Sequence, residues 1–256
     1  MEGEEKMKWE FTHKQLREYF DFLKTQGTTT SFADMENMES IENPIVVRHD
    51  VDLDLFSAYV VANIEWHMGI NSTFFIRVAS ETYNIFSLQS RTILEAMCRQ
   101  GFEIGLHFDP VIHPYDAQRM LYIEAQMLEC VLPERYHVKS VSYHNPSTNP
   151  DKFPLEGYID AYNERIWSDA NYISDSCMNF RDKDPYEFVK NAARPVQILL
   201  HPIHYCHHDK GYLNIMRQHF RNKMDNLHAD YRDNFTFVKE IGDADLADLL
   251  MKKENG

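Results

Sequence analysis

The segment that decides the fold is Ile45-Val46-Val47-Arg48-His49-Asp50-Val51-Asp52. A β-branched apolar run that leads straight into charged residues is typical of a buried strand with functional groups at its end. Alternate residues of a strand point to the same side, so Asp50 and Asp52 are expected to share one face. Two adjacent carboxylates repel each other unless a cation or a proton lies between them. The pair therefore predicts a metal site, although Asp52 or Asp54 could instead cap the helix expected from Leu55.

On both sides of this segment, amphipathic runs alternate with short apolar runs. The expected helices are 11–25, 55–68, 86–99, 116–131 and 244–253. The expected strands begin at 45 and continue with 72–78, 102–107, 138–143, 171–176, 196–201 and 235–241. The polar stretch 28–44 is expected to be a loop. About seven such βα units predict a parallel sheet. A (β/α) barrel is favoured over a doubly wound sheet, because no phosphate-binding glycine loop follows the first strand.

Composition restricts the partners and the domain organisation. A net charge of −14 would repel nucleic acid and anionic membrane surfaces. No apolar run is long enough to span a membrane and no signal peptide is visible, so a cytoplasmic location is expected. The four cysteines form no C-x-x-C pair and are expected to be free thiols. No linker divides the 256 residues, which predicts one domain: a helix and loop over 1–43, a core over 44–205, and C-terminal helices and the last strand over 206–256. The oligomeric state is not predicted.

Ionisable residues recur at the expected strand ends. Besides the aspartate pair, these positions hold His107, His144, Asp175 and His201. The carboxyl ends of parallel barrel strands meet on one face, so the side chains are expected to converge there. Two imidazoles and one carboxylate form a common catalytic zinc set that leaves a coordination position open. The histidines at 204, 207 and 208 are interpreted as a solvated loop rather than a second metal site.

These motifs resemble those of the polysaccharide deacetylases, the nodulation-deacetylase-like group of carbohydrate esterase family four. The similarity covers about residues 44–205, through RHDVD (48–52), INSTFF (70–75), GFEIGLH (101–107) and ILLHPIHY (198–205). It implies a distorted (β/α) barrel and a zinc-type metal, with cobalt, nickel or iron as alternatives. It also implies hydrolysis of an N-acetyl group on an amino sugar. By resemblance, Asp50 is the base, Asp52 and His107 are metal ligands, and His201 is the general acid.

The sequence departs from the family pattern at two places. Val111 stands where the family has a second histidine, so the third ligand is expected to be His144, with His113 as the alternative. The family's arginine that orients the base is missing from its usual motif, where Asn145 is found, and Arg48 or Arg181 is expected to replace it. Asp175 is expected to orient His201 or bind the sugar. The residues expected to contact the substrate are Arg48, Asn145, Arg181 and Tyr205. The substrate is expected to be a small molecule or an oligosaccharide. Two rival functions remain: hydrolysis of another small amide, such as a ureide or a cyclic amide, and sugar binding without catalysis.

Overall fold

The computed structural model describes residues 9–146, 153–232 and 235–242. The chain divides into two compact units, residues 1–209 and 210–256. The first unit contains all the strands of the described residues. The second contains the helices α6 (Tyr212–Tyr231) and α7 (Phe235–Ile241). The single-domain organisation of the whole chain stays a prediction.

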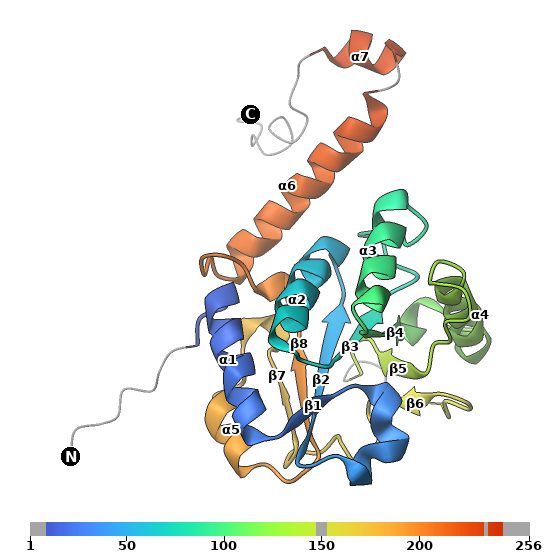
Figure 1. Ribbon diagram of the computed structural model, residues 1–256. Helices are drawn as coiled ribbons and strands as arrows, with labels where there is room; N and C mark the ends of the chain where they lie inside the picture. The colour runs from blue at the N-terminus through green and yellow to red at the C-terminus, as the bar shows by residue number, and fades with distance from the viewer. Residues whose placement is uncertain (1–8, 147–152, 233–234, 243–256) are drawn as a thin grey trace. The chain divides into compact units, whose positions relative to one another are not determined.

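One curved parallel sheet forms the centre of the first unit (Figure 1). Its strands are β1 (Thr28–Thr30), β2 (Pro44–Val51), β3 (Thr73–Ile76), β4 (Glu103–Phe108), β5 (Ser140–Tyr143), β6 (Ile159–Asp160), β7 (Tyr172–Ser174) and β8 (Val196–Leu200). Seven of them follow the order β6-β5-β4-β3-β2-β8-β7, and β1 pairs with β2 beside this path. Within the described residues β6 and β7 do not pair, so the barrel is open there. The predicted distorted (β/α) barrel of about seven parallel strands is confirmed.

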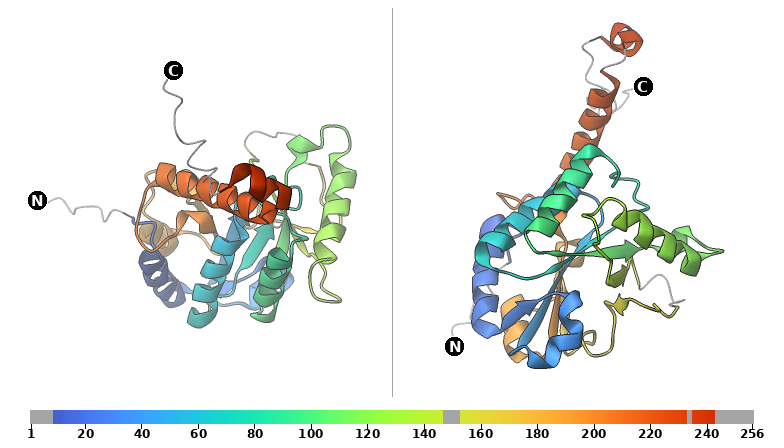
Figure 2. Two further views of the ribbon diagram at one scale, coloured as in Figure 1. Left: turned by 90° about the horizontal axis from the view of Figure 1, so that it is seen from above. Right: turned by 45° about the vertical axis from the view of Figure 1, so that its right-hand side comes forward.

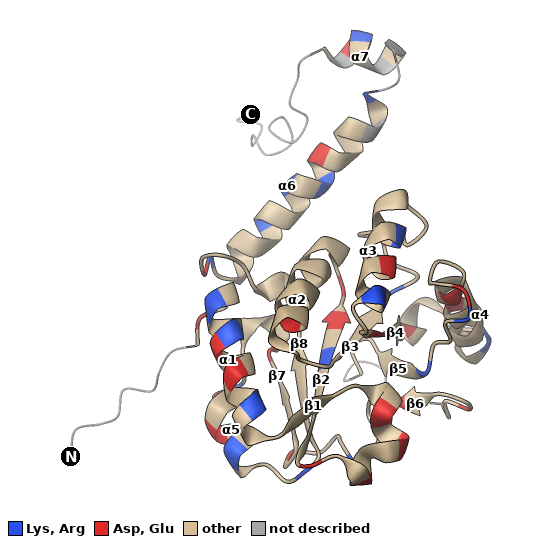
Figure 3. Ribbon diagram, in the orientation of Figure 1, with Lys and Arg blue, Asp and Glu red and all other residues tan. Residues whose placement is uncertain are grey.

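Helices cover the outer side of the sheet. They are α1 (His13–Gln26), α2 (Leu55–Met68), α3 (Leu88–Arg99), α4 (Ala117–Glu129) and α5 (Pro185–Asn191). Helix α2 packs between α1 and α3, and Figure 2 shows these helices along the outside of the strands. Each of the three begins at a hydroxyl or carboxylate cap, such as Asp54, whose Oδ2 accepts from the Ser57 N–H at 2.8 Å. Charged residues lie mostly on helices and loops, but β2 carries both signs (Figure 3).

Strand β2 is buried on both faces, and the two faces differ in chemistry. Arg48 and Asp50 point into the barrel. His49 points outward, where its Nε2 lies 2.7 Å from Glu65 Oε1 of α2. Ser72 donates to the other oxygen of Glu65 at 2.6 Å, and His49 stacks on Phe74. The contacts of Glu65 with His49 and Ser72 thus join β2 and the start of β3 to the helix between them, whereas His49 Nδ1 is buried without a hydrogen-bond partner.

Several predicted elements need correction. The segment 28–44 is not a loop: the β-branched residues Thr28–Thr30 pair with β2, and a 3-10 helix, η1, covers Phe32–Ser40. The segment 235–241 is not a strand but α7, because a short apolar run fits either period and no strand lies beside it in the described part of residues 210–256. Strand β6 and helix α5 were not expected. The helix expected at 244–253 lies outside the described residues.

The remaining predicted strands and helices are present, with ends shifted by a few residues. All four cysteines are free thiols, as expected. Among the described residues, the longest helices are too polar to cross a lipid bilayer.

Candidate active site

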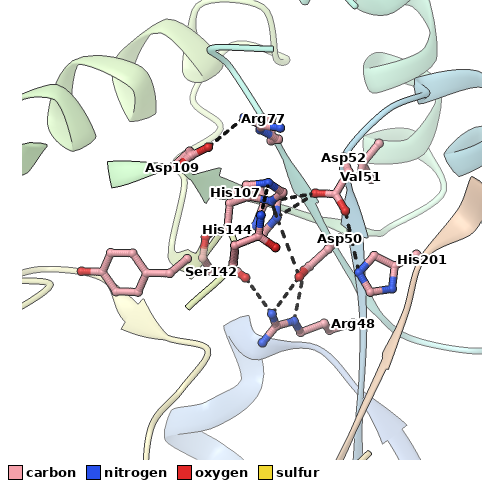
Figure 4. A network of polar contacts seen from close by, with 12 residues as sticks. Arg48, Asp50, Val51, Asp52, Arg77, His107, Asp109, Ser142, His144 and His201 are labelled. Carbon is pink, nitrogen blue, oxygen red and sulfur yellow. Dashed lines mark hydrogen bonds and ion pairs between the residues drawn. The ribbon is translucent and has the colours of Figure 1, made fainter. Parts of the chain in front are cut away.

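Three predicted ligands meet at the carboxyl ends of β2, β4 and β5 (Figure 4). Asp52 Oδ1 lies 3.1 Å from His107 Nε2 and 3.0 Å from His144 Nδ1. The two imidazole nitrogens are 3.1 Å apart. These atoms form a nearly equilateral triangle, and its carboxylate and two imidazoles are the donor set that the sequence predicted.

Second partners fix the two imidazoles. His107 Nδ1 lies 3.1 Å from the Ser142 carbonyl oxygen, which only accepts, so Nδ1 carries the proton and Nε2 has the lone pair. His144 Nε2 lies 3.0 Å from the Asn145 amide. With the amide turned so that its oxygen accepts from Nε2–H, His144 Nδ1 also presents a lone pair. In these tautomers three lone pairs would face one another, an arrangement that suits a cation; without a cation, protons on the same two ring nitrogens bond to Asp52.

The triangle fits a transition-metal cation. Bonds of about 2.1 Å hold ligand atoms roughly 3.0 Å apart at right angles and roughly 3.4 Å apart in a tetrahedron. The observed separations of 3.0–3.1 Å lie within this range. Imidazole together with carboxylate suits zinc, cobalt, nickel or iron better than magnesium or calcium, which prefer all-oxygen sets.

Asp52 is not the helix cap, because Asp54 takes that role. The loop after β3 instead holds the backbone around Asp52. The Tyr83 hydroxyl donates to the Val51 carbonyl at 2.7 Å, and Thr82 donates to the Asp52 carbonyl at 3.4 Å. Although burial opposes ionisation, the bonds from His107 and His144 hold the pKa of Asp52 well below its usual value. Asp52 is therefore a fixed, ionised carboxylate and a candidate metal ligand.

Asp50 lies beside the triangle and is paired with Arg48. The Arg48 Nε–H and one terminal N–H donate to the two oxygens of Asp50 at 3.1 and 2.8 Å, and both side chains are buried. Burial opposes ionisation of Asp50, but the guanidinium outweighs it and lowers the pKa of the carboxyl. Asp50 Oδ2 is 3.8 Å from His107 Nε2, so an ionised carboxylate stands next to the candidate metal position.

Three residues that the sequence did not point to hold Arg48 in place. It donates to Gln197 Oε1 at 2.9 Å, to Ser142 Oγ at 2.8 Å and to the Tyr162 hydroxyl at 2.8 Å. Its guanidinium also lies 4.8 Å from the Tyr162 ring centroid. Nothing in the sequence marks these partners, because they come from β8, β5 and a loop far from Arg48 along the chain. Of the two arginines expected to orient Asp50, the structure places Arg48 there.

A second polar cluster follows β7 and β8. Asp175 Oδ1 accepts from His201 Nδ1 at 2.6 Å, and both carboxylate oxygens accept from the His201 backbone N–H. The other side of Asp175 contacts His204 Nδ1 at 3.2 Å. Burial would lower the pKa of His201, but Asp175 dominates and raises it to about 9. His201 Nε2, 3.8 Å from Asp52 Oδ2, thus carries a proton toward the candidate metal position. His204 is buried, which its position in a histidine-rich stretch of the sequence did not reveal.

The other predicted residues lie apart from the triangle. His113 Nε2 contacts Glu124 at 2.6 Å, with its ring stacked on Phe108. Arg181 is exposed and lines a pocket that includes none of the triangle residues. Tyr205 is buried near Asp175, and burial raises its pKa well above the usual value. Of the two candidates for the third ligand, only His144 reaches Asp52.

No family model matches the chain, and no curated protein matches it. The solved structures that are similar to it include the following two. One is the chitin deacetylase of the fungal pathogen Colletotrichum lindemuthianum, with a TM-score of 0.41 and 13% identity, covering 70% of this chain and 81% of that one. The other is a CE4 family pseudoenzyme from Bacillus anthracis, with a TM-score of 0.41 and 11% identity, covering 72% of this chain and 61% of that one. At these scores neither likeness carries an argument about the reaction, and the fold is established by the sheet itself.

Proposed function

We propose that the protein is a metal-dependent amide hydrolase that removes the acetyl group from an N-acetylated amino sugar, as a divergent relative of the polysaccharide deacetylases. The observation that carries the proposal is the grouping around one point. Three kinds of group face the same position: the metal-donor atoms of the triangle, the ionised carboxylate of Asp50, and the protonated imidazole of His201. Arg48 holds Asp50, and Asp175 holds His201. Binding a sugar needs neither a base nor an acid beside a cation.

The chain's own residues divide the proton transfers of amide hydrolysis between them. A divalent cation held by Asp52, His107 and His144 would supply a Lewis acid for the amide carbonyl and the attacking water. Asp50 stays ionised near neutral pH and accepts a proton from that water as it attacks. His201 donates the proton on Nε2 to the leaving nitrogen, which departs as an amine. One water is consumed, and acetate and amine are released.

The positions of the two groups suit these roles. Asp50 and His201 approach the triangle from different sides, through 3.8 Å contacts to His107 and Asp52. Asp50 is paired with Arg48 and His201 with Asp175, so each group has its own counter-charge. Their pKa values are pushed in opposite directions, Asp50 down and His201 up, which is the pattern expected of an acid and a base that work together.

The test is acetate release by the full-length protein loaded with zinc or cobalt. The substrates are N-acetylglucosamine, N-acetylgalactosamine, short N-acetylglucosamine oligomers, and a cyclic amide and a ureide for comparison. Asp50→Asn keeps the shape of the carboxylate but cannot accept a proton. It should keep the metal and the fold and lose about 10² to 10⁴ in kcat. Asp116→Asn, an exposed aspartate at the start of α4, is the matched control and should leave kcat unchanged.

Three results would overturn the proposal. Full activity in Asp50→Asn would show that this residue is not the base. Loss of metal in that variant would make Asp50 a ligand and exchange its role with that of Asp52. Sugar binding by metal-loaded protein with no acetate release from any substrate would show an inactive relative.

A further inference from the structure

A pocket of about 400 Å³ lies along β7, outside the set of residues that approach the triangle. Its main lining residues are Trp167, Tyr172, Ser174, Phe180, Arg181 and Lys183. The volume lies within the usual range for pockets that bind small molecules. Trp167 is 37% exposed, a large amount for so apolar a ring, and it meets Tyr162 edge-on with ring centroids 5.3 Å apart.

The pocket shares a wall with the interior of the barrel. Tyr172 is the register partner of Gln197, and paired residues of a parallel sheet point to the same side. Gln197 accepts from Arg48, which holds Asp50. Ser174 is followed directly by Asp175, the carboxylate that orients His201. The pocket therefore borders the part of the barrel that holds Gln197 and Arg48, and one of its lining residues, Ser174, directly precedes Asp175 in the chain.

The charge of the pocket is opposite to that of the protein. The chain carries a net charge of −14, yet two cations, Arg181 and Lys183, line the pocket with a single carboxylate, Asp169. No side-chain hydrogen bond or ion pair joins Arg181 to another residue in the described part of the chain. Lys183 Nζ lies 4.8 Å above the Phe188 ring rather than against an acid. An arginine fork and a nearby ammonium suit a phosphate oxyanion.

The backbone that presents Arg181 adopts an unusual conformation. Arg181 and Asp182 have φ values of 55° and 61°, and Cys177 and Met178, just before them, have φ values of 55° and 54°. Left-handed φ is costly for residues other than glycine and asparagine, and such residues gather at ligand clamps. Four residues with left-handed φ lie within positions 177–182. The backbone there is neither helical nor extended, and it presents Arg181 to the pocket.

We propose that this pocket binds the phosphate-bearing part of a phosphorylated N-acetylated amino sugar, with the sugar ring against Trp167 and the phosphate on Arg181 and Lys183. The proposal rests on the proposed function for the identity of the sugar and narrows its substrate class from neutral glycans to phosphorylated sugars. The proposal assigns Trp167 to the sugar ring and the two cations, Arg181 and Lys183, to the phosphate dianion.

The experiment is isothermal titration calorimetry of the full-length protein in chelator, so that no hydrolysis occurs. The probes are N-acetylglucosamine 1-phosphate, N-acetylglucosamine and inorganic phosphate. Arg181→Asn removes the charge with a residue that tolerates positive φ. Arg135→Asn is the matched control, because Arg135 is also exposed and has a φ of 67°. The phosphorylated sugar should bind at least tenfold more tightly than the other two probes. Arg181→Asn should remove this advantage, whereas Arg135→Asn should change affinity less than twofold.

Equal affinity for the phosphorylated and unphosphorylated sugars would overturn the proposal, and so would an equal loss in the two arginine variants. Inorganic phosphate binding as tightly as the sugar phosphate would overturn the role of Trp167. Because the measurement reads binding without metal, its outcome is independent of acetate release. Tight binding of the sugar phosphate with no hydrolysis would support the pocket while refuting the proposed reaction.

Discussion

In the metal-free protein, His201 is expected to make folding stability depend on pH. Its pKa is raised from 6.5 to about 9, mainly because Asp175 outweighs the cost of burial. A group whose pKa is higher in the folded state stabilises the fold fully below its unfolded pKa, and this stabilisation is lost as the pH rises through the folded pKa. The window therefore runs from about pH 6.5 to about pH 9. At about 1.4 kcal/mol per pKa unit, the shift corresponds to roughly 3 kcal/mol.

The measurement is urea unfolding followed by tryptophan fluorescence, in chelator, at about pH 6 and about pH 9.5. Between these values the wild-type free energy of unfolding should fall by about 3 kcal/mol more than that of His201→Gln, whose side chain does not titrate. The exposed His208 supplies the control, since His208→Gln should behave like the wild type. Equal changes in the wild type and His201→Gln, to within about 1 kcal/mol, would refute the strong Asp175–His201 coupling on which the proposed acid depends.

Three further predictions concern the metal ligands and the base. His144→Ala should weaken zinc binding more than tenfold in a chelator competition, whereas His113→Ala should change it little, because that ring is committed to a glutamate on α4; the reverse ranking would make His113 the ligand. Asn145→Gly tolerates the backbone φ of 46° but removes the amide that contacts His144, so zinc affinity should drop about tenfold. Asn145→Asp keeps an acceptor oxygen at that position and should retain the zinc affinity. Arg48→Met should raise the pKa of Asp50 and so move the acid limb of the pH–rate profile to higher pH; an unmoved acid limb would exclude Asp50 as the titrating base. The same variant should lower the free energy of unfolding in urea by about 3–5 kcal/mol, because it leaves a buried carboxylate without its partner.

The parts of the fold that were predictable are those with local signals. The apolar run before Arg48 and the glycines after the helices located most strands and helices, because periodicity and helix ends are properties of neighbouring residues. Strand β1 was missed because three threonines look polar, although pairing with β2 gives them a sheet position. The segment from Phe235 was misassigned because its pattern fits both a helix and a strand.

The site residues also divide into those that a local sequence signal marks and those that it does not. Asp52, His107 and His144 were predicted because each ends a strand, and parallel strands bring their ends together. The partners Gln197, Ser142 and Tyr162 of Arg48 were not predictable, because only the three-dimensional register of β5 and β8 brings them to one guanidinium. His204 was assigned to a solvated loop because composition alone cannot distinguish a surface histidine from one buried against Asp175.

The two-sided burial of β2 has a consequence for how this protein can evolve. A residue inserted between Arg48 and His49 would exchange inward and outward positions from that point on. The imidazole now fastened to Glu65 would then face the cavity, and the aspartate would be pressed against α2 without its arginine. Such a change would destroy the packing and the chemistry together, so descendants of this chain should vary in length in the loops after the strands and never within this one.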